Sequence, residues 1–395
     1  MRPCWPPTEN IAEIMSQLKS SFPPPSARIA VAMSGGVDSS VAAALLVDQG
    51  YQVVGVHMKL HDLPSEERRD KSCCSIDDSL DARQACARLG IPFYVLDFTE
   101  RFQSSVIDYF IDGYRAGETP NPCVMCNRKV KNSVLLDRVR EFGCDFLATG
   151  HYARIRHSAK GAEGDGSGNG AWELARPRDR HKDQTYFLFG TPREELPHLL
   201  FPLADLDKTQ TRAVAEKRRF FTWNKPDSQE VCFVPSDYRK FLRERMEPVL
   251  PGNFVDRSGK VLGTHGGIPF YTVGQRRGLG LSAPEPLYVV ALRPQSNEVV
   301  LGAEPELFSR GMRVGGANWV SRPPITAPIE AEVKIRYSHQ GARARIVPEK
   351  QPGGEDTLRV EFETPVRAIA PGQAAVFYQD DVLLGGGWIL PVENI

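Results

Sequence analysis

The sequence predicts an α/β protein with an N-terminal doubly wound parallel sheet, a small, mainly β linking domain and a C-terminal β-barrel. Residues 27–149 alternate short β-branched runs with longer amphipathic segments, the order typical of a parallel sheet covered by helices on both faces. After Cys232, short alternating runs punctuated by Gly and Pro replace the long helices, which is typical of small β domains and barrels. A chain of 395 residues also exceeds what one hydrophobic core usually supports.

The elements of the first domain are expected in strand–helix order. The predicted strands are 28–33 (RIAVAM), 51–58 (YQVVGVHM), 93–98 (FYVLDF) and 146–150 (FLATG). The predicted helices are 38–50, 75–90, 104–114 and 132–143. A hairpin tip is expected at 160–170, because KGAEGDGSGNG is too rich in Gly and polar residues to pack. Ligands of such a domain gather at the carboxyl ends of the strands.

The β part of the chain is expected at seven short runs: 254–259, 286–292, 298–302, 331–338, 344–348, 357–363 and 374–390. The expected division is an N-terminal extension at 1–27, a catalytic domain at 28–233, a small central domain at 234–305 and a barrel at 306–395. No stretch has the length and apolarity of a membrane span, so no membrane partner is expected.

Composition narrows the class of protein only slightly. Hydrophobic residues make up 41% of the chain and charged residues 25%, which is ordinary for a globular protein. Forty-nine basic and 49 acidic residues balance, so net charge neither favours nor excludes a nucleic-acid partner. Eight cysteines without a secretory signal at the N-terminus favour a reducing compartment, and the expected location is the cytoplasm.

Residues 34–40, SGGVDSS, follow the first predicted strand and open a helix. Two glycines let the backbone approach an anion closely, and the helix N-terminus adds amides and a favourable dipole. The pattern lacks the Lys of a Walker A loop. It therefore predicts a phosphate-binding loop of another type, with a ligand-free strand–helix turn as the alternative.

Cysteines form the second motif. Cys123 and Cys126 lie three residues apart in TPNPCVMCNRKVK, and Cys232 follows far along the chain in KPDSQEVCF. The pair alone fits half of a zinc site, a redox dithiol, part of an iron–sulfur site, or two neighbouring thiols with no joint role. Cys86 and Cys144 fall on apolar faces and are expected in the core, and adjacent Cys73 and Cys74 are expected to be incidental thiols.

Several motifs together resemble those of the tRNA-specific 2-thiouridylase family (MnmA type) of PP-loop ATP pyrophosphatases. In order, they are AMSGGVDSS, GVHMK, TPNPCVMCN, ATGHYAR, KDQTYFL, KPDSQEVCF, TVGQRRGLG and APGQAAVFY, spanning about residue 28 to the C-terminus. The resemblance implies an adenine nucleotide hydrolase-like first domain. It also implies an enzyme that adenylates the wobble uridine of tRNA with ATP and replaces its 2-oxygen by sulfur, releasing AMP and pyrophosphate.

The resemblance assigns ATP with Mg²⁺ to ten residues: Ala32, Met33, Ser34, Gly35, Gly36, Val37, Asp38, Ser39, Met58 and Gly150. It makes Cys232 the carrier of the sulfur as a persulfide and Cys126 its thiol partner, with Cys123 the third catalytic candidate. The target base and tRNA are assigned to Asn121, Pro122, Cys123, His151, Lys182, Asp183, Gln184, Arg336, Tyr337 and Gln373.

The chain departs from the family pattern at Cys123, where many members carry Asp. A thiol is a poor match for a carboxylate, so an acid–base role at this position is open. Cys123, Cys126 and Cys232 are alternatively three ligands of a [4Fe–4S] cluster that supplies the sulfur. A structural zinc would need a fourth ligand from Cys73, Cys74 or a histidine.

The implied partners are tRNA, with glutamate, lysine and glutamine acceptors expected, and a sulfur-donor protein, either a cysteine desulfurase or a relay protein. Two other functions stay open from the residues. A small-molecule ligase of the argininosuccinate or guanylate type would explain SGGVDSS but leave the cysteines without a role. The other is an ATP-gated, zinc-stapled RNA-binding module without turnover. The turn GQRRGLG is either RNA-facing or structural.

Overall fold

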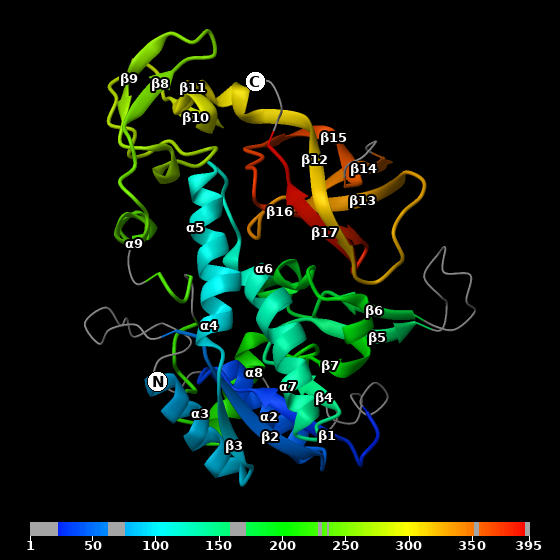
Figure 1. Cartoon of the computed structure of the whole chain (residues 1–395). Coiled ribbons are helices and arrows are strands. Elements are labelled where there is room, and N and C mark those ends of the chain that lie inside the picture. Colours follow the sequence, from blue (N-terminus) through cyan, green and yellow to red (C-terminus); the bar gives the residue numbers. More distant parts are fainter. Residues whose placement is uncertain are drawn as a thin grey trace, which may run out of the picture.

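The computed structural model describes residues 23–61, 76–158, 171–227, 231–234, 237–350 and 355–391. Three bodies follow one another along the chain: a parallel-sheet domain, a small central domain and a barrel (Figure 1). This arrangement confirms the predicted fold class. Cys73, Cys74, the first 22 residues and the hairpin tip at 160–170 lie outside the described residues.

A five-stranded parallel sheet in the order β3-β2-β1-β4-β7 forms the first domain. Its strands are β1 (Arg28–Ala32), β2 (Gln52–Lys59), β3 (Phe93–Asp97), β4 (Phe146–Ala148) and β7 (Leu199–Leu200). The strand order reverses between β1 and β4, so the loops after these strands lie beside one another at the carboxyl edge. That crevice is where open α/β sheets bind their ligands.

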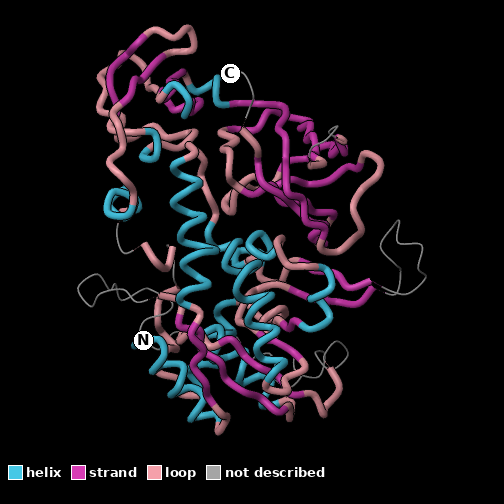
Figure 2. Tube along the Cα trace, in the orientation of Figure 1, coloured by secondary structure: helices cyan, strands magenta, loops and turns pink. Residues whose placement is uncertain are grey.

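Helices cover both faces of this sheet (Figure 2). Alternate residues of β1 serve the two faces: Ile29 and Val31 pack with α2 (Val37–Asp48), α3 (Ile76–Leu89) and α8 (Lys208–Lys217), whereas Ala30 and Ala32 belong to the opposite core. The opposite face carries two long helices that include turns of π-helical type. Their segments are α4 (Thr99–Phe102), η3 (Gln103–Ile107), α5 (Asp108–Arg115), α6 (Pro122–Cys126), η4 (Asn127–Leu135) and α7 (Leu136–Glu141).

The central domain consists of α9 (Tyr238–Arg245) and a four-stranded sheet in the order β10-β11-β8-β9. Its strands are β8 (Gly252–Val255), β9 (Val261–His265), β10 (Tyr288–Arg293) and β11 (Glu298–Gly302). Phe241 and Leu242 of α9 and Phe254 of β8 join the same apolar cluster as the long helix α4–α5, which ties this domain to the first.

The C-terminal sheet closes into a six-stranded barrel, since β12 pairs with both β15 and β17. Its strands are β12 (Phe308–Trp319), β13 (Ile329–Lys334), β14 (Ala342–Glu349), β15 (Thr357–Arg367), β16 (Ala374–Gln379) and β17 (Val382–Ile389). The hairpin of β5 (Arg154–Ser158) and β6 (Ala171–Ala175) extends this sheet, because β6 pairs with β17. A segment of the first domain is thus part of the barrel's sheet.

Three 3₁₀ turns, η5 (Arg180–Lys182), η6 (Thr185–Leu188) and η7 (Arg193–His198), link that hairpin back to the parallel sheet. Three others, η8 (Ile268–Phe270), η9 (Pro294–Ser296) and η10 (Glu304–Leu307), lie in the central domain and before the barrel. In the part of the chain that the structure describes, no helix is long and apolar enough to cross a membrane.

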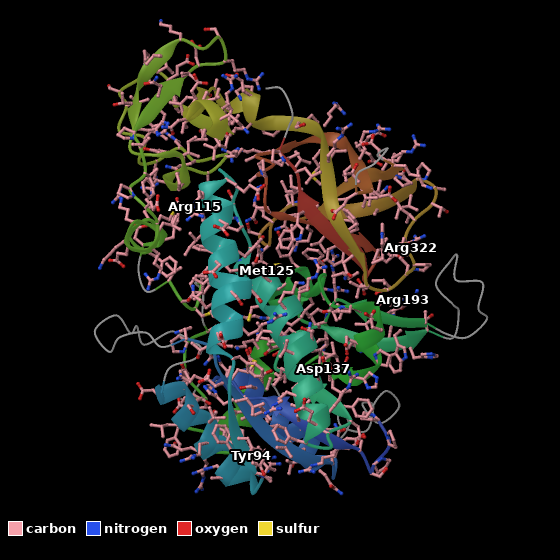
Figure 3. The ribbon with its side chains drawn as sticks, in the orientation of Figure 1. Tyr94, Arg115, Met125, Asp137, Arg193 and Arg322 are labelled. Carbon is pink, nitrogen blue, oxygen red and sulfur yellow. The ribbon has the colours of Figure 1, made fainter. Side chains whose placement is uncertain are left out.

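The barrel forms hydrogen bonds with the loop that precedes the first cysteine motif. Thr119 donates its N–H to the carbonyl of Pro371 at 2.8 Å, and the Gln373 side-chain amide donates to the carbonyl of Thr119 at 2.8 Å. Gly372 lies between these contacts with φ of +81°, and a Cβ there would lie 2.7 Å from Cβ of Glu118. Met125, next to Cys126 on α6, lies between the sheet domain and the barrel (Figure 3).

We expect Gly372→Ala to loosen this contact. Gly280 is a matched control, because it has a positive φ of +71° but open space around the added Cβ. Backbone strain should cost each variant about 1 kcal/mol of unfolding free energy, and the collision with Glu118 should cost Gly372→Ala about 1–3 kcal/mol more. Urea unfolding of both variants measures this difference. Equal destabilisation of the two would show that the barrel contact contributes nothing.

Candidate active site

The loop at residues 33–36 connects β1 to α2 at the carboxyl edge of the sheet. Gly35 has φ of +74°, and a Cβ on it would lie 2.2 Å from the carbonyl oxygen of Asp78, so only glycine fits. Ser39 Oγ accepts from the N–H of Ser34 at 3.2 Å and lies 3.2 Å from the carbonyl of Gly36, to which it donates. These contacts hold the loop closed around the N-terminus of α2, as an anion-binding loop requires.

A second loop, which follows β4, packs against the first. A Cβ on Gly150 would lie 2.6 Å from the backbone nitrogen of Ser39 and 2.7 Å from the carbonyl carbon of Asp38. The neighbouring His151 places Nδ1 2.7 Å from Oγ1 of Thr149. Burial, and then the charge of Lys131, lowers the pKa of His151 to about 3. His151 is therefore neutral at physiological pH and can exchange hydrogen bonds but not act as a cation.

A chain of alternating charges borders the first loop. Lys208 donates to both carboxylate oxygens of Asp38, at 2.7 and 2.9 Å, and also pairs with Asp227 at 2.7 Å. Asp227 pairs in turn with Lys182 at 2.8 Å. Burial raises the pKa of Asp38 although Lys208 opposes it, whereas hydrogen bonds from Lys182 and Lys208 outweigh burial at Asp227 and lower its pKa. Sequence reasoning missed Lys208 and Asp227, although Asp227 lies inside the KPDSQEVC motif.

The other side of the loop is held by Lys225. Its ammonium donates to the carbonyl of Gly35 at 3.2 Å and to the carboxylates of Asp78 and Asp81 at 2.7 and 2.8 Å. Lys225 and Asp227 flank Pro226, so the segment that leads toward Cys232 contacts the loop region at two points.

The first cysteine motif lies at the start of a helix. Asn121 caps α6 by accepting from the N–H of Val124 at 3.3 Å, and Pro122 takes the first helical position, where its missing N–H costs nothing. Cys123 is exposed and Cys126 is buried. The two thiols therefore differ in their access to solvent and reagents.

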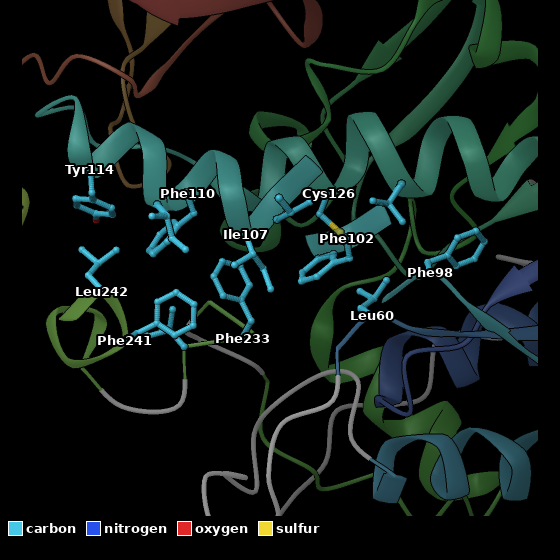
Figure 4. Packing of buried hydrophobic residues seen from close by; sticks show 14 of the residues in the cluster. Leu60, Phe98, Phe102, Ile107, Phe110, Tyr114, Cys126, Phe233, Phe241 and Leu242 are labelled. Carbon is cyan, nitrogen blue, oxygen red and sulfur yellow. The ribbon is translucent and has the colours of Figure 1, made fainter. Parts of the chain in front are cut away.

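Cys232 lies in a tight turn, in which Val234 donates its N–H to the carbonyl of Val231 at 3.1 Å. The next residue, Phe233, is buried and contacts Phe102 and Phe110 edge-on, with ring centroids 5.7 and 5.2 Å apart. Cys126 belongs to the same apolar cluster (Figure 4). Half-buried Cys232 packs against this cluster. The fold thus brings two cysteines that are distant in sequence to one cluster.

The predicted metal sites gain no support. Among the described residues, no group of three or more Cys, His, Asp or Glu side chains is placed to hold a metal ion. Cys123, Cys126 and Cys232 are among these described residues, so the structure does not support the iron–sulfur alternative. Cys86 and Cys144 lie in the core as predicted, and burial raises the pKa of the Cys86 thiol to about 12.

Several residues predicted to contact tRNA are held by the protein itself. Asp183 accepts from the N–H and hydroxyl of Thr185 at 2.9 and 2.6 Å, and the Gln184 side chain accepts from the N–H of Tyr152 at 2.9 Å. Arg336 donates to the carbonyl of Arg367 at 3.1 Å. Lys182 and Gln373 make the contacts given above.

Tyr337 is the exception among them. It is 41% exposed, with one face against Phe187 at 4.6 Å between ring centroids. It therefore has surface left for an outside partner.

Met58 packs half-buried against the same cluster as Cys126, near the carboxyl end of β2.

The fold and the site together define an α/β protein with a loop of the anion-binding type at the carboxyl edge of its parallel sheet, two cysteines at one apolar cluster and an appended β-barrel. Comparisons with known proteins agree with this class. The family models described as the tRNA methyl transferase HUP domain, the tRNA methyl transferase PRC-barrel domain and the aminomethyltransferase beta-barrel domain match residues 27–236, 239–303 and 309–389.

The curated relatives are more specific. The tRNA-specific 2-thiouridylase MnmA of Symbiobacterium thermophilum is 47% identical over 372 residues, covering 93% of each chain. That of Carboxydothermus hydrogenoformans is 48% identical over 366 residues, covering 92% of this chain and 97% of the relative. The chain belongs to the tRNA-specific 2-thiouridylase family. This membership confirms the predicted enzyme class, a tRNA sulfurtransferase.

Solved structures are more distant. A 4-thiouridine synthetase–RNA complex with bound ATP is 15% identical, covers 55% of this chain and 50% of that chain, and has a TM-score of 0.35. A likeness of this size carries no argument about function.

We expect Gly150→Ala to weaken nucleotide binding, because its new Cβ would push the loop after β4 away from Asp38 and Ser39. The matched control is Gly266→Ala, where the added Cβ meets nothing within 4 Å. ATP affinity measured by calorimetry should fall roughly tenfold or more in Gly150→Ala, the equivalent of about 1.4 kcal/mol. The control should match the wild type, and unchanged affinity in both variants would separate Gly150 from the nucleotide site.

Proposed function

We propose that this protein is an ATP-dependent tRNA 2-thiouridylase that adenylates the wobble uridine and delivers sulfur through a cysteine persulfide. The observation that carries the proposal is that Cys126 belongs to one apolar cluster and Cys232 packs against the same cluster, which also includes Val56 of β2. Family membership supports the substrate. ATP binding is supported by the strand–loop–helix geometry at Gly35 and Ser39.

Adenylation makes the 2-oxygen of uridine replaceable, since oxide is a poor leaving group and AMP a good one. The uridine O2 would attack the α-phosphorus of ATP, and pyrophosphate would leave with the electron pair of the broken P–O bond. Residues 32–39, Met58 and Gly150 would hold the nucleotide. Mg²⁺ would be bound mainly by the phosphates, and Asp38, which is paired with Lys208, is the carboxylate within SGGVDSS.

Sulfur transfer would then use both thiols. The terminal sulfur of a Cys232 persulfide attacks C2 of the adenylated base and displaces AMP. The Cys126 thiolate next attacks Sγ of Cys232, so that the S–S bond to the transferred sulfur breaks and its electron pair forms the C=S product. The cysteines end as a disulfide, which a cellular thiol reductant reopens with two electrons. A cysteine desulfurase or relay protein would supply the persulfide sulfur.

The uridine must leave its stack in the anticodon to reach these groups. Asn121, Pro122 and Cys123, at the start of α6, would line the base. The barrel's grip on Thr119 supports this placement, because it fixes the loop just before them. We further propose that residues 28–233 carry the chemistry and residues 306–395 carry tRNA contacts such as Tyr337, with residues 234–305 joining them. Glutamate, lysine and glutamine tRNAs are the expected substrates.

The first experiment substitutes the sulfur carrier. Cys232→Ser should abolish tRNA thiolation, detected by retardation of thiolated tRNA in a mercury-containing gel, while ATP binding persists. Cys126→Ser should also be inactive, because the persulfide adduct would not be resolved. Cys86→Ala removes a buried thiol of the other core cluster, on the opposite face of the parallel sheet, and should remain active. Thiolation retained in Cys232→Ser would refute the assignment.

A second experiment separates the persulfide route from the iron–sulfur alternative. The protein purified without oxygen should contain no stoichiometric iron or acid-labile sulfide while it thiolates tRNA. Cys123→Ser should then retain some activity, since its role would be limited to positioning the base. A cluster that is present in the wild type and lost in Cys123→Ser would instead place the sulfur on iron.

A further inference from the structure

Lys208 is the first residue of α8, and its backbone is fixed from two sides. Asp207 and Gln210 form a capping box, in which Gln210 N–H donates to Asp207 at 2.8 Å and Asp207 N–H donates to Gln210 at 3.0 Å. The Lys208 N–H itself donates to Asp179 at 3.1 Å. The side chain therefore starts from a rigid point, as a group that must meet a ligand at a defined place requires.

The Lys208 ammonium points toward the first turn of α2, which follows the loop at residues 33–36. Its side chain is only 12% exposed, and its three short contacts all go to carboxylate oxygens, two on Asp38 and one on Asp227. Asp38 lies in the first turn of α2, inside SGGVDSS, and Gly150 packs on its backbone. A cation that reaches this carboxylate lies at the edge of the proposed phosphate site.

We propose that Lys208 binds the phosphates of ATP and stabilises the pyrophosphate that leaves during adenylation, with Asp227 as the residue that positions it. This inference rests on the proposed function. Without nucleotide, Asp38 and Asp227 hold the ammonium. A polyphosphate carries more negative charge than these carboxylates and competes for the same donor.

The charges around the loop favour this role for Lys208 over its neighbours. Lys208, Lys182 and Arg212 face the two carboxylates of Asp38 and Asp227, so the cluster has an excess of one positive charge. Lys225 does not face Asp38 or Asp227. Its ammonium contacts Asp78, Asp81 and the Gly35 carbonyl, and it therefore stabilises the loop from the other side.

Adenylation explains why a positive charge is needed at the position of the Lys208 ammonium. As the bond between the α-phosphorus and its bridging oxygen breaks, pyrophosphate takes the electron pair and its negative charge grows. A preorganised ammonium at that point stabilises the charge more in the transition state than in the bound substrate. Asp227 also contacts Lys182 and Arg212, and its negative charge offsets part of the repulsion among the three cations at this edge of the site.

Equilibrium binding tests the inference without turnover. ATP, inorganic pyrophosphate and adenosine are titrated by calorimetry into the wild type, Lys208→Met and Lys217→Met. Lys217 is the matched control, since it lies exposed on the same helix. Lys208→Met should bind ATP and pyrophosphate roughly 10- to 100-fold more weakly, as expected for a lost charge-assisted hydrogen bond, and adenosine equally well. Lys217→Met should bind all three as the wild type does.

Two further variants guard against misfolding. Lys208→Arg keeps the charge and should restore most of the affinity for ATP. The double variant Lys208→Met with Asp227→Asn removes one positive and one negative charge together, so it should fold even if the single variant does not, and it should still bind pyrophosphate weakly. ATP affinity within twofold of the wild type in either Lys208→Met variant overturns the inference, as does an equal loss for adenosine.

The outcomes also separate this inference from the proposed function. If the wild type binds no ATP, the proposed function fails at its first step. If the wild type binds ATP and Cys232→Ser abolishes thiolation, but Lys208→Met binds ATP normally, the proposed function stands and only the role of Lys208 is wrong.

Discussion

The site depends on one steric constraint, the close approach of two loops at the carboxyl edge of the parallel sheet. β1 and β4 are hydrogen-bonded neighbours, so the loops that follow them have to share the same space. Gly150 makes this possible because it has no Cβ to collide with Ser39, and Gly35 plays the same part against Asp78. The anion-binding loop, the neutral His151 and the charge chain through Asp38 all take their positions from this contact.

Apolar packing holds the two cysteine motifs in place. Phe233 is held edge-on between aromatic rings of the long helix α4–α5, and it anchors the turn of Cys232. Cys126 enters the same cluster from α6. Because these contacts are side-chain packing in a dense core, the thiols are set on rigid supports although both lie near irregular backbone.

Periodicity was enough to predict the parallel sheet and most of its helices, because each strand and helix there carries its own local signal. It was not enough for β12, in whose sequence FSRGMRVGGANW only Met312 and Val314 give a short apolar alternation, and which is stabilised by pairing with β15 and β17. The loop at residues 34–40 and the cysteine motifs were recognisable from local residues. Lys208, Asp227 and the contact of Gln373 with Thr119 were not, since pairs that meet only in the folded chain leave no mark in sequence spacing.

The pairing of β6 with β17 has a consequence for how the protein is made. Ala175 and Leu174 find their partners, Val382 and Leu383, only at the far end of the chain. During synthesis the hairpin emerges long before the strand that completes it, so its edge stays open while the central domain and barrel are translated. Such long-range pairing is slow to form. The edge of β6 is therefore covered only after β17 has left the ribosome, and a truncation that removes β17 leaves this edge exposed.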